Sequence, residues 1–284
     1  MKTKIKFGLR VLGYVLAIHV LVSLFLVYRM INPDGINSAR TPDYFGLKYE
    51  EVSFKSADGT DLAGWYLDNE KESTAIVMHG YPADKGSMLS EITLLAEDFN
   101  VLAFDFRGLG ESGGKNSTLG AKETKDLHGA IDYLKEEKNI EEVSLWGFSM
   151  GAGVALQVAP QRDEVIAVVS DSSFSSMEKS LDSLFGVPIL SQTMKPFIRF
   201  WTKRLVDVDT KEVTPYKSAK EIDVPVYIIH AVDDPVVTID HAKELKEFLS
   251  HNSDLEVEFI ESDSHGQLPG SIDSRVKDFL KKDI

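Results

Sequence analysis

From residue 46 onwards the chain alternates between short apolar segments and amphipathic segments, and this alternation restricts the fold more than any other feature. Short runs rich in Val, Ile and Ala predict buried strands, and the longer runs with helical spacing between them predict helices. The expected strands cover 74–78, 101–106, 142–146, 165–169, 224–229 and 255–260, and the expected helices cover 87–98, 118–137, 151–159, 239–249 and 272–280. Continuous apolar strands separated by helices are typical of a mostly parallel sheet with helices on both faces.

Two segments depart from this alternation. Residues 48–55 and 61–67 are strand-like and are joined by Ser-Ala-Asp-Gly-Thr, which predicts an antiparallel hairpin at the start of the sheet. Residues 173–222 carry many aromatic and aliphatic side chains with three interspersed prolines, and we expect them to form a small helical cap above the sheet. Residues 46–284 are therefore expected to be one α/β domain, a size that a single domain of this class reaches.

The N-terminal part contains an apolar run at residues 11–28 that has one His, His19, and no Lys, Arg, Asp or Glu. As a helix the run spans about 27 Å, close to the roughly 30 Å of a bilayer's hydrocarbon core. We therefore expect a basic tail at 1–6, a transmembrane anchor at 7–28 and a linker rich in Pro, Gly, Asn and Asp at 29–45. The alternative is a signal peptide that is cleaved to release a secreted protein, but no pair of small residues marks a cleavage site after the run.

The charge distribution predicts an orientation. The chain has a net charge of −14, yet residues 1–40 hold six Lys or Arg and one Asp, a net charge of +5, which leaves −19 for the rest. Basic residues that precede an anchor place the N-terminus in the cytoplasm, so the acidic domain is expected on the extracytoplasmic side of the cell membrane. The acidic body argues against nucleic acid as a partner, because phosphates are bound by clustered Lys and Arg. The absence of Cys excludes disulfides and a Cys nucleophile.

Residues 147–151 read Gly-Phe-Ser-Met-Gly and lie between an expected strand and an expected helix. In a G-x-S-x-G turn of this kind the serine, here Ser149, lies on a strained strand-to-helix corner that exposes its hydroxyl. Gly147 and Gly151 suit the corner because side chains at these positions collide in so tight a turn. A nearby helix N-terminus also favours negative charge that develops on a substrate oxygen. Ser149 is therefore the candidate nucleophile.

Three further motifs accompany this turn: His-Gly-Tyr-Pro at 79–82, Asp-Phe-Arg-Gly-Leu-Gly-Glu-Ser at 105–112 and His-Ala-Val-Asp-Asp at 230–234. With them, residues 48–284 resemble the α/β-hydrolase superfamily. Among its subfamilies, the sequence looks most like the Bem46-like single-pass membrane hydrolases and is also similar to the serine aminopeptidase S33-type group. The resemblance implies an α/β-hydrolase fold and a Ser, Asp, His order of catalytic residues.

A serine nucleophile needs a base, and the base needs an orienting carboxylate. His265 follows an expected strand in a polar loop, whereas His241 lies early in an expected helix and His251 lies at its end, so His265 is the candidate base. The family's H-G-x-x-D register points to Asp234 as the acid. Asp233 remains an alternative, because Ala replaces the usual Gly at position 231 and loosens the register.

The oxyanion of an acyl-transfer reaction needs two backbone N–H donors. Met150, directly after the nucleophile, and Tyr81, in the loop that corresponds to the family's second donor, are the candidates. Phe148, Phe197 and Trp201 are candidate lining residues of the substrate pocket. The scattered His residues predict no metal site, and the glycine-rich run at 108–114 lacks the G-K-[ST] of a phosphate-binding loop, so no cofactor is expected.

Together these features predict a membrane-anchored serine hydrolase that cleaves a carboxylic ester or thioester through an acyl-enzyme. Its expected substrate is a small or lipid-like acyl compound. Two alternatives stay open: a serine peptidase of the S33 type, which the resemblance permits, and a catalytically idle fold that acts as a membrane-tethered binding module. The sequence leaves the oligomeric state open.

Overall fold

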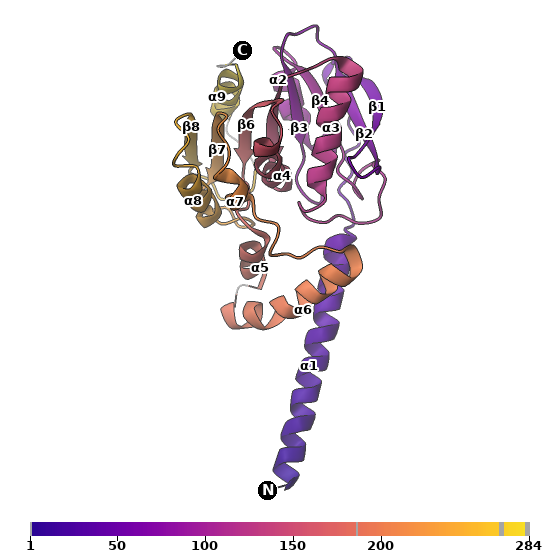
Figure 1. The fold of residues 1–284 in the computed structure, drawn as a ribbon, viewed down its shortest axis with the longest axis vertical. Coiled ribbons are helices and arrows are strands. Elements are labelled where there is room, and N and C mark those ends of the chain that lie inside the picture. Colours follow the sequence, from indigo (N-terminus) through magenta and orange to yellow (C-terminus); the bar gives the residue numbers. More distant parts are fainter. Residues whose placement is uncertain (1, 186, 267–269, 282–284) are drawn as a thin grey trace.

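The computed structural model describes residues 2–185, 187–266 and 270–281, and it contains one central eight-stranded sheet (Figure 1). The strands are β1 (Glu50–Lys55), β2 (Asp61–Leu67), β3 (Thr74–Met78), β4 (Asn100–Phe104), β5 (Val143–Phe148), β6 (Val165–Asp171), β7 (Val226–Ala231) and β8 (Leu255–Ile260). The helices are α1 (Lys2–Ile31), α2 (Leu89–Leu95), α3 (Glu123–Lys138), α4 (Met150–Val158), α5 (Met177–Phe185), α6 (Pro188–Val206), α7 (Pro215–Ala219), α8 (Ile239–Phe248) and α9 (Gly270–Leu280).

The sheet has the order β1-β2-β4-β3-β5-β6-β7-β8. β1 and β2 form the expected antiparallel hairpin, and β2 pairs antiparallel with β4. The other neighbouring strands pair in parallel. β3, β4 and β5 are apolar along almost their whole length because they are covered on both faces. The expected fold, a mostly parallel sheet with an antiparallel N-terminal hairpin, is confirmed.

Two layers of helices cover the sheet. The helices α3, α4, α7 and α8 contribute to one buried apolar cluster with one face of the sheet, and α2 and α9 contribute to a second cluster on the opposite face. In parallel strands all carboxyl ends lie at one edge, and the loops after β3, β5, β7 and β8 meet there. This edge holds the candidate functional residues.

α3 begins five residues later than the sequence pattern predicts, at Glu123 instead of 118. Before it, the carboxylate of Glu123 accepts hydrogen bonds from the backbone N–H groups of Thr118 and Gly120 and from the Thr118 hydroxyl. Leu119 has φ 56° and Gly120 has φ 92°, which a helix does not allow. The buried carboxylate therefore stabilises a turn where the apolar spacing alone favoured a helix.

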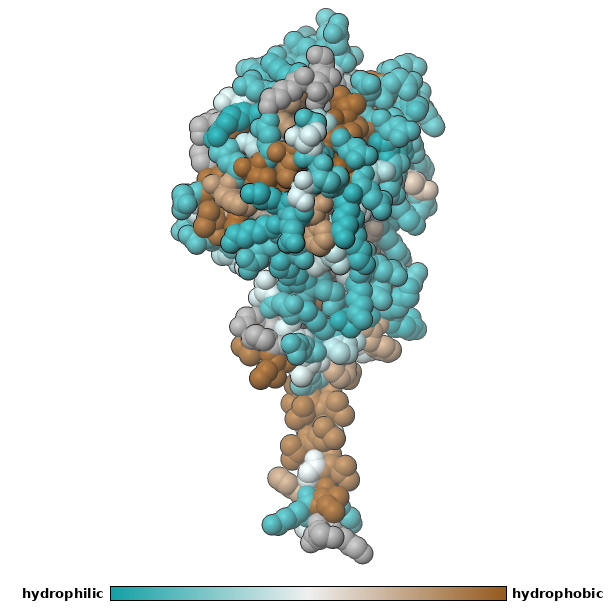
Figure 2. Space-filling view, turned by 60° about the vertical axis from the view of Figure 1, so that its left-hand side comes forward, coloured by the Kyte–Doolittle hydropathy of each residue, from teal (hydrophilic) through white to brown (hydrophobic). Residues whose placement is uncertain are grey.

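α1 is long and mostly free of contacts. It is the one helix in the described parts of the chain that is long and apolar enough to cross a membrane. Its C-terminal half contacts α6, which lies across it below the sheet (Figure 1). Figure 2 shows a brown, apolar surface along α1 and further apolar side chains at the lower end of the globular body.

The segment between α1 and β1, expected to be a linker, makes defined contacts with the domain. The Ile36 N–H donates to the carbonyl of Pro82 at 3.0 Å, and the Ser38 N–H donates to the carboxylate of Asp84 at 2.7 Å. At the end of α1, the carbonyl of Ile31 accepts the N–H of Ser117 at 3.0 Å. α1 is thus held against the domain rather than joined to it by a free tether.

Candidate active site

Ser149 lies on a strained turn between β5 and α4. Its φ of 51° and ψ of −109° are unusual for a residue with a side chain. A Cβ on Gly147 would lie 2.4 Å from the Ala152 nitrogen, and a Cβ on Gly151 would lie 2.6 Å from the Met78 carbonyl oxygen. Only glycine fits at these two positions. The corner therefore has the close-packed geometry that the Gly-x-Ser-x-Gly spacing predicts.

His265 lies between Ser149 and Asp234. Its Nδ1 is 2.6 Å from Asp234 Oδ2, and its Nε2 is 2.9 Å from Ser149 Oγ. A carboxylate only accepts hydrogen bonds, so Nδ1 carries the hydrogen and Nε2 is free to accept the hydroxyl hydrogen of Ser149. The three side chains come from the loops after β5, β7 and β8, which explains how residues 116 positions apart meet.

Asp234 is buried, whereas the neighbouring Asp233 is exposed. Burial raises the pKa of Asp234, but hydrogen bonds from His265 and from the N–H groups of Val237 and Val236 outweigh it, so the pKa lies below its usual value. The carboxylate of Asp234 is thus kept charged beside the imidazole. The structure brings Asp234, and not Asp233, to His265.

His230 positions the loop that carries Asp234. Its Nε2–H donates to the carbonyl of Val237 at 2.7 Å, and this hydrogen bond joins the end of β7 to the loop that carries Asp234. Burial lowers the pKa of His230, and the hydrogen bond to Val237 and the charge of Asp234 only partly oppose this, so the ring is neutral. Burial likewise lowers the pKa of His79, which donates from Nδ1 to the Gly80 carbonyl. Both His residues are structural.

The loop after β3 lies directly against the Ser149 turn. A Cβ on Gly80 would lie 3.1 Å from the Ser149 Cβ and 2.9 Å from the Phe148 ring. Tyr81, which follows Gly80, and Met150 both line the cavity at Ser149. Met150 is the first residue of α4, where backbone N–H groups have no partner within the helix. Both candidate donors therefore lie next to the serine.

A cavity of about 500 Å³ adjoins Ser149. Its walls are largely apolar and come from α1, from the segment 174–183 and from the loops at the carboxyl edge of the sheet, including the loop after β7. The lining side chains include Met30, Leu119, Phe174, Met177, Leu181 and Val237. Such a cavity can hold an acyl group next to the hydroxyl.

The three pocket residues expected from the sequence lie elsewhere. Phe148 packs against the His265 ring, with the ring centroids 4.9 Å apart, so it supports the base instead of lining the cavity. Phe197 contacts His19 of α1, and Trp201 belongs to the apolar cluster between α1, α5 and α6. None of the three lines this cavity, and for Phe197 and Trp201 the reason is that α6 packs its apolar side on α1.

Several residues of the cavity wall were not expected from the sequence. Met30 was assigned to the linker, and Leu119 was assigned to the first turn of a helix. Tyr81 also holds Met30 in place, because its hydroxyl donates to the Met30 carbonyl at 2.8 Å. Burial raises the pKa of this Tyr81 hydroxyl to about 12. No local motif marks these residues, because they meet only when α1 and the domain pack together.

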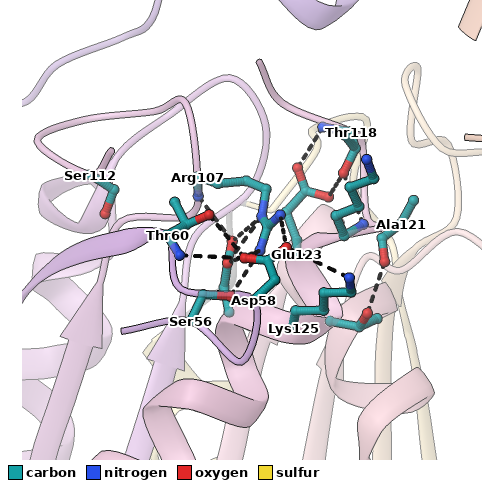
Figure 3. A network of polar contacts seen from close by, with 12 residues as sticks. Ser56, Asp58, Thr60, Arg107, Ser112, Thr118, Ala121, Glu123 and Lys125 are labelled. Atoms are coloured by element: carbon teal, nitrogen blue, oxygen red, sulfur yellow. Dashed lines mark hydrogen bonds and ion pairs between the residues drawn. The ribbon is translucent and has the colours of Figure 1, made fainter. Parts of the chain in front are cut away.

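Arg107 is the centre of a buried polar network that supports the catalytic edge (Figure 3). Its guanidinium binds the carboxylates of Asp126 on α3 and Asp58 in the β1–β2 turn, and the hydroxyl of Ser56. The Arg107 N–H also donates to Asp126 at 3.0 Å. Arg107 thus joins three segments of the domain and does not reach the cavity at Ser149. No group of His, Asp and Glu able to hold a metal ion occurs within the described ranges.

The fold and the geometry at Ser149 define an α/β hydrolase. The chain has the α/β-hydrolase fold, and the family model described as the alpha/beta hydrolase fold matches residues 76–206. Among solved structures, the chain is similar to the esterase Pf2001 of Pyrococcus furiosus, with a TM-score of 0.75 and 28% identity, covering 89% of this chain and 99% of that one.

Curated relatives are similar over two-thirds of the chain. YqkD of Bacillus subtilis, an uncharacterized protein, is 28% identical over 201 residues, which cover 68% of this chain and 65% of that protein. The lysophosphatidylserine lipase ABHD12 of Macaca fascicularis is 28% identical over 204 residues, which cover 68% of this chain and 50% of the lipase. The aligned part of the chain thus spans between half and two-thirds of these relatives.

Proposed function

We propose that the protein is a serine hydrolase that cleaves the carboxylic ester or thioester of a lipid-like acyl substrate. In this reaction His265 accepts the proton of Ser149 as Oγ attacks the acyl carbonyl. The backbone N–H groups of Met150 and Tyr81 stabilise the oxyanion. The leaving group departs with the proton from His265, and water then hydrolyses the acyl-enzyme by the same route.

The observation that carries this proposal is the continuous pair of hydrogen bonds from Asp234 through His265 to Ser149, at 2.6 and 2.9 Å. The apolar cavity beside Ser149 supports an acyl substrate. The similarity to an esterase structure and to a lysophosphatidylserine lipase supports ester chemistry.

We further propose that α1 anchors the enzyme in the cell membrane as a single span, with the N-terminus in the cytoplasm. The exposed apolar surface of α1 and the basic residues that precede it support this arrangement. The catalytic domain then lies on the extracytoplasmic side.

The decisive experiment compares the chain with its Ser149→Ala variant. We expect the unmodified chain to react with a fluorophosphonate probe and to hydrolyse an activated acyl ester with an initial burst. We expect the variant to lose the labelling and at least 10³-fold of kcat, because the nucleophile is absent. Full labelling of Ser149→Ala would refute the assignment.

Substrate panels separate the remaining alternatives. Acyl esters and thioesters of increasing chain length are compared with aminoacyl and prolyl amides. We expect the esters and thioesters to be preferred, because the cavity walls are apolar. Preference for the amides would instead support the peptidase, and a chain with neither a burst nor a probe adduct would support the binding module.

A further inference from the structure

We propose that α6 is a second membrane-contacting element, which lies in the lipid leaflet on the side of the catalytic domain, beside α1. This inference rests on the proposed anchoring of α1. It concerns where the cap sits rather than what Ser149 cleaves.

The first argument is the outward face of α6. Ile189, Thr193, Pro196 and Phe200 follow one another at helical spacing and are all exposed. Ile189 is 77% exposed and Phe200 is 58% exposed. The opposite side of α6 is apolar as well, because Met194 and Ile198 are buried against α1 and α5. A helix that is apolar on two sides is not typical of a helix that borders water.

The second argument is the length of α1. From Phe7 to Ile18 every residue of α1 is exposed, and these 12 residues span about 18 Å of a hydrocarbon core of roughly 30 Å. To span the remaining 12 Å or so of the hydrocarbon core, α1 needs about eight more residues, 19–26. That segment is where α6 contacts α1: the His19 ring lies 5.8 Å from the Phe197 ring and forms a 3.4 Å contact with the Thr193 hydroxyl. A bilayer that α1 spans therefore reaches α6.

The third argument is the orientation and charge of α6. It lies across α1, so an α1 that crosses the membrane leaves α6 close to the membrane plane (Figure 1). Its basic residues at the middle are directed inward, where Lys195 pairs with Asp182 and Arg199 pairs with Glu178, each at 2.6 Å. An aromatic and aliphatic outer face combined with basic residues on a separate side, here the side toward α5, is typical of helices that lie in a lipid interface.

The space-filling view shows an apolar surface beside α1 (Figure 2). Figure 2 shows apolar side chains at the base of the globular body, close to the apolar surface of α1, whereas most of the body above is hydrophilic. The occupant that fits an apolar face continuous with a membrane anchor is the phospholipid leaflet itself.

The test uses the full-length chain in vesicles of phosphatidylcholine and phosphatidylglycerol. Because the chain has no Cys, single substitutions place one spin label each at Ile189→Cys, Phe200→Cys, Leu12→Cys and Phe259→Cys. Leu12 of α1 is the reference for lipid exposure. Phe259 of β8 is the matched control, an exposed aromatic residue of the catalytic domain. Collisions with oxygen and with a water-soluble nickel chelate report the surroundings of each label.

We expect the labels at 189 and 200 to resemble the label at 12, with high oxygen and low chelate accessibility, and the label at 259 to show the reverse. If the labels at 189 and 200 are as accessible to the chelate as the label at 259, while the label at 12 is still protected, the inference about α6 is overturned and the anchoring of α1 is not. Spin–spin broadening at 200 would assign the face to a second copy of the chain and would also overturn it. A chelate-accessible label at 12 would refute the anchoring of α1 and with it the inference. None of these readouts depends on catalysis. A failure of the inference about α6 is therefore distinguishable from a failure of the proposed hydrolase activity.

Discussion

At the scale of single residues, the candidate site depends on which of two adjacent acids faces His265. Asp234 is buried and accepts three hydrogen bonds, from His265 and from the N–H groups of Val236 and Val237. The His230 Nε2 lies 3.8 Å from the same carboxylate. Asp233 faces solvent. The two residues therefore offer a matched pair for mutation.

We expect Asp234→Asn to lower kcat by about 10³- to 10⁴-fold, because the amide no longer holds His265 in the tautomer that accepts the Ser149 proton. Asp233→Asn should leave kcat within about twofold, since surface changes of this kind have small effects. The measurement is the steady-state hydrolysis of an activated ester by both variants. Equal losses in the two variants would contradict the assignment of Asp234.

At the scale of elements, Arg107 determines how the β1–β2 turn, the loop after β4 and α3 pack together. Its partner Asp126 has no exposed side-chain surface, so the pair is a buried one. Removing one partner of a buried ion pair leaves an uncompensated charge, which costs more than the pair contributed.

We therefore expect Arg107→Met to lower the free energy of unfolding by about 3 to 5 kcal/mol. Adding Asp126→Asn should recover part of this loss, because the orphaned carboxylate is then neutral. The measurement is urea denaturation of the detergent-solubilised chain and its two variants. A loss well below about 1 kcal/mol in the single variant would show that the network is solvated.

His241 at the start of α8 connects that helix to the loop after β6. The Ser175 N–H donates to its Nδ1 at 3.0 Å, and no partner for its Nε2 occurs among the described residues. Burial, with a smaller contribution from Lys179, lowers the pKa of His241 to about 4. As the pH falls from about 6.5 towards 4, the unfolded chain takes up a proton that the folded chain does not, so stability decreases.

This difference in pKa predicts that the free energy of unfolding falls by about 2 kcal/mol between pH 7.5 and pH 5 through His241 alone. Urea denaturation at both pH values measures it. In His241→Gln the pH dependence should be smaller by this amount, whereas other titrating groups still contribute. An unchanged pH dependence in the variant would rule out His241 as the source.

At the scale of the whole molecule, α1, the cap and the catalytic domain form a connected unit. Met30 of α1 lines the cavity at Ser149, and the Tyr81 hydroxyl binds the Met30 carbonyl. The end of α1 is therefore part of the cavity wall, and the catalytic edge of the sheet faces the end of the molecule where α1 enters the domain.

The orientation of this unit in a membrane is testable with the same Cys-free background. We expect Glu137→Cys, at an exposed position of α3, to react with a membrane-impermeant maleimide on intact cells. Lys4→Cys should react only after permeabilisation, because the proposed topology places the basic tail in the cytoplasm. The opposite labelling would reverse the proposed topology.

The sequence alone determined the class of fold and most of the catalytic edge. Apolar strands and helical spacing are local consequences of burial, and the Gly-Phe-Ser-Met-Gly corner, His265 and Asp234 belong to short segments whose places in the sheet follow from chain order. The strands and the corner could be predicted because each depends on neighbours a few residues away, whereas the choice of Asp234 over Asp233 depends on the contact with His265.

Only the tertiary structure decided which side chains form the walls of the cavity next to Ser149. The sequence did not identify Met30, Leu119 or Leu181 as cavity walls, and it did not predict that Phe197 and Trp201 pack beside α1. These side chains acquire their partners only through the packing of segments that are distant in the sequence. Apolar side chains bury themselves without directional preference, so their composition indicates that they are buried but not against what. The sequence therefore predicted the candidate residues around Ser149, and the packing of distant helices set the walls of the cavity beside it.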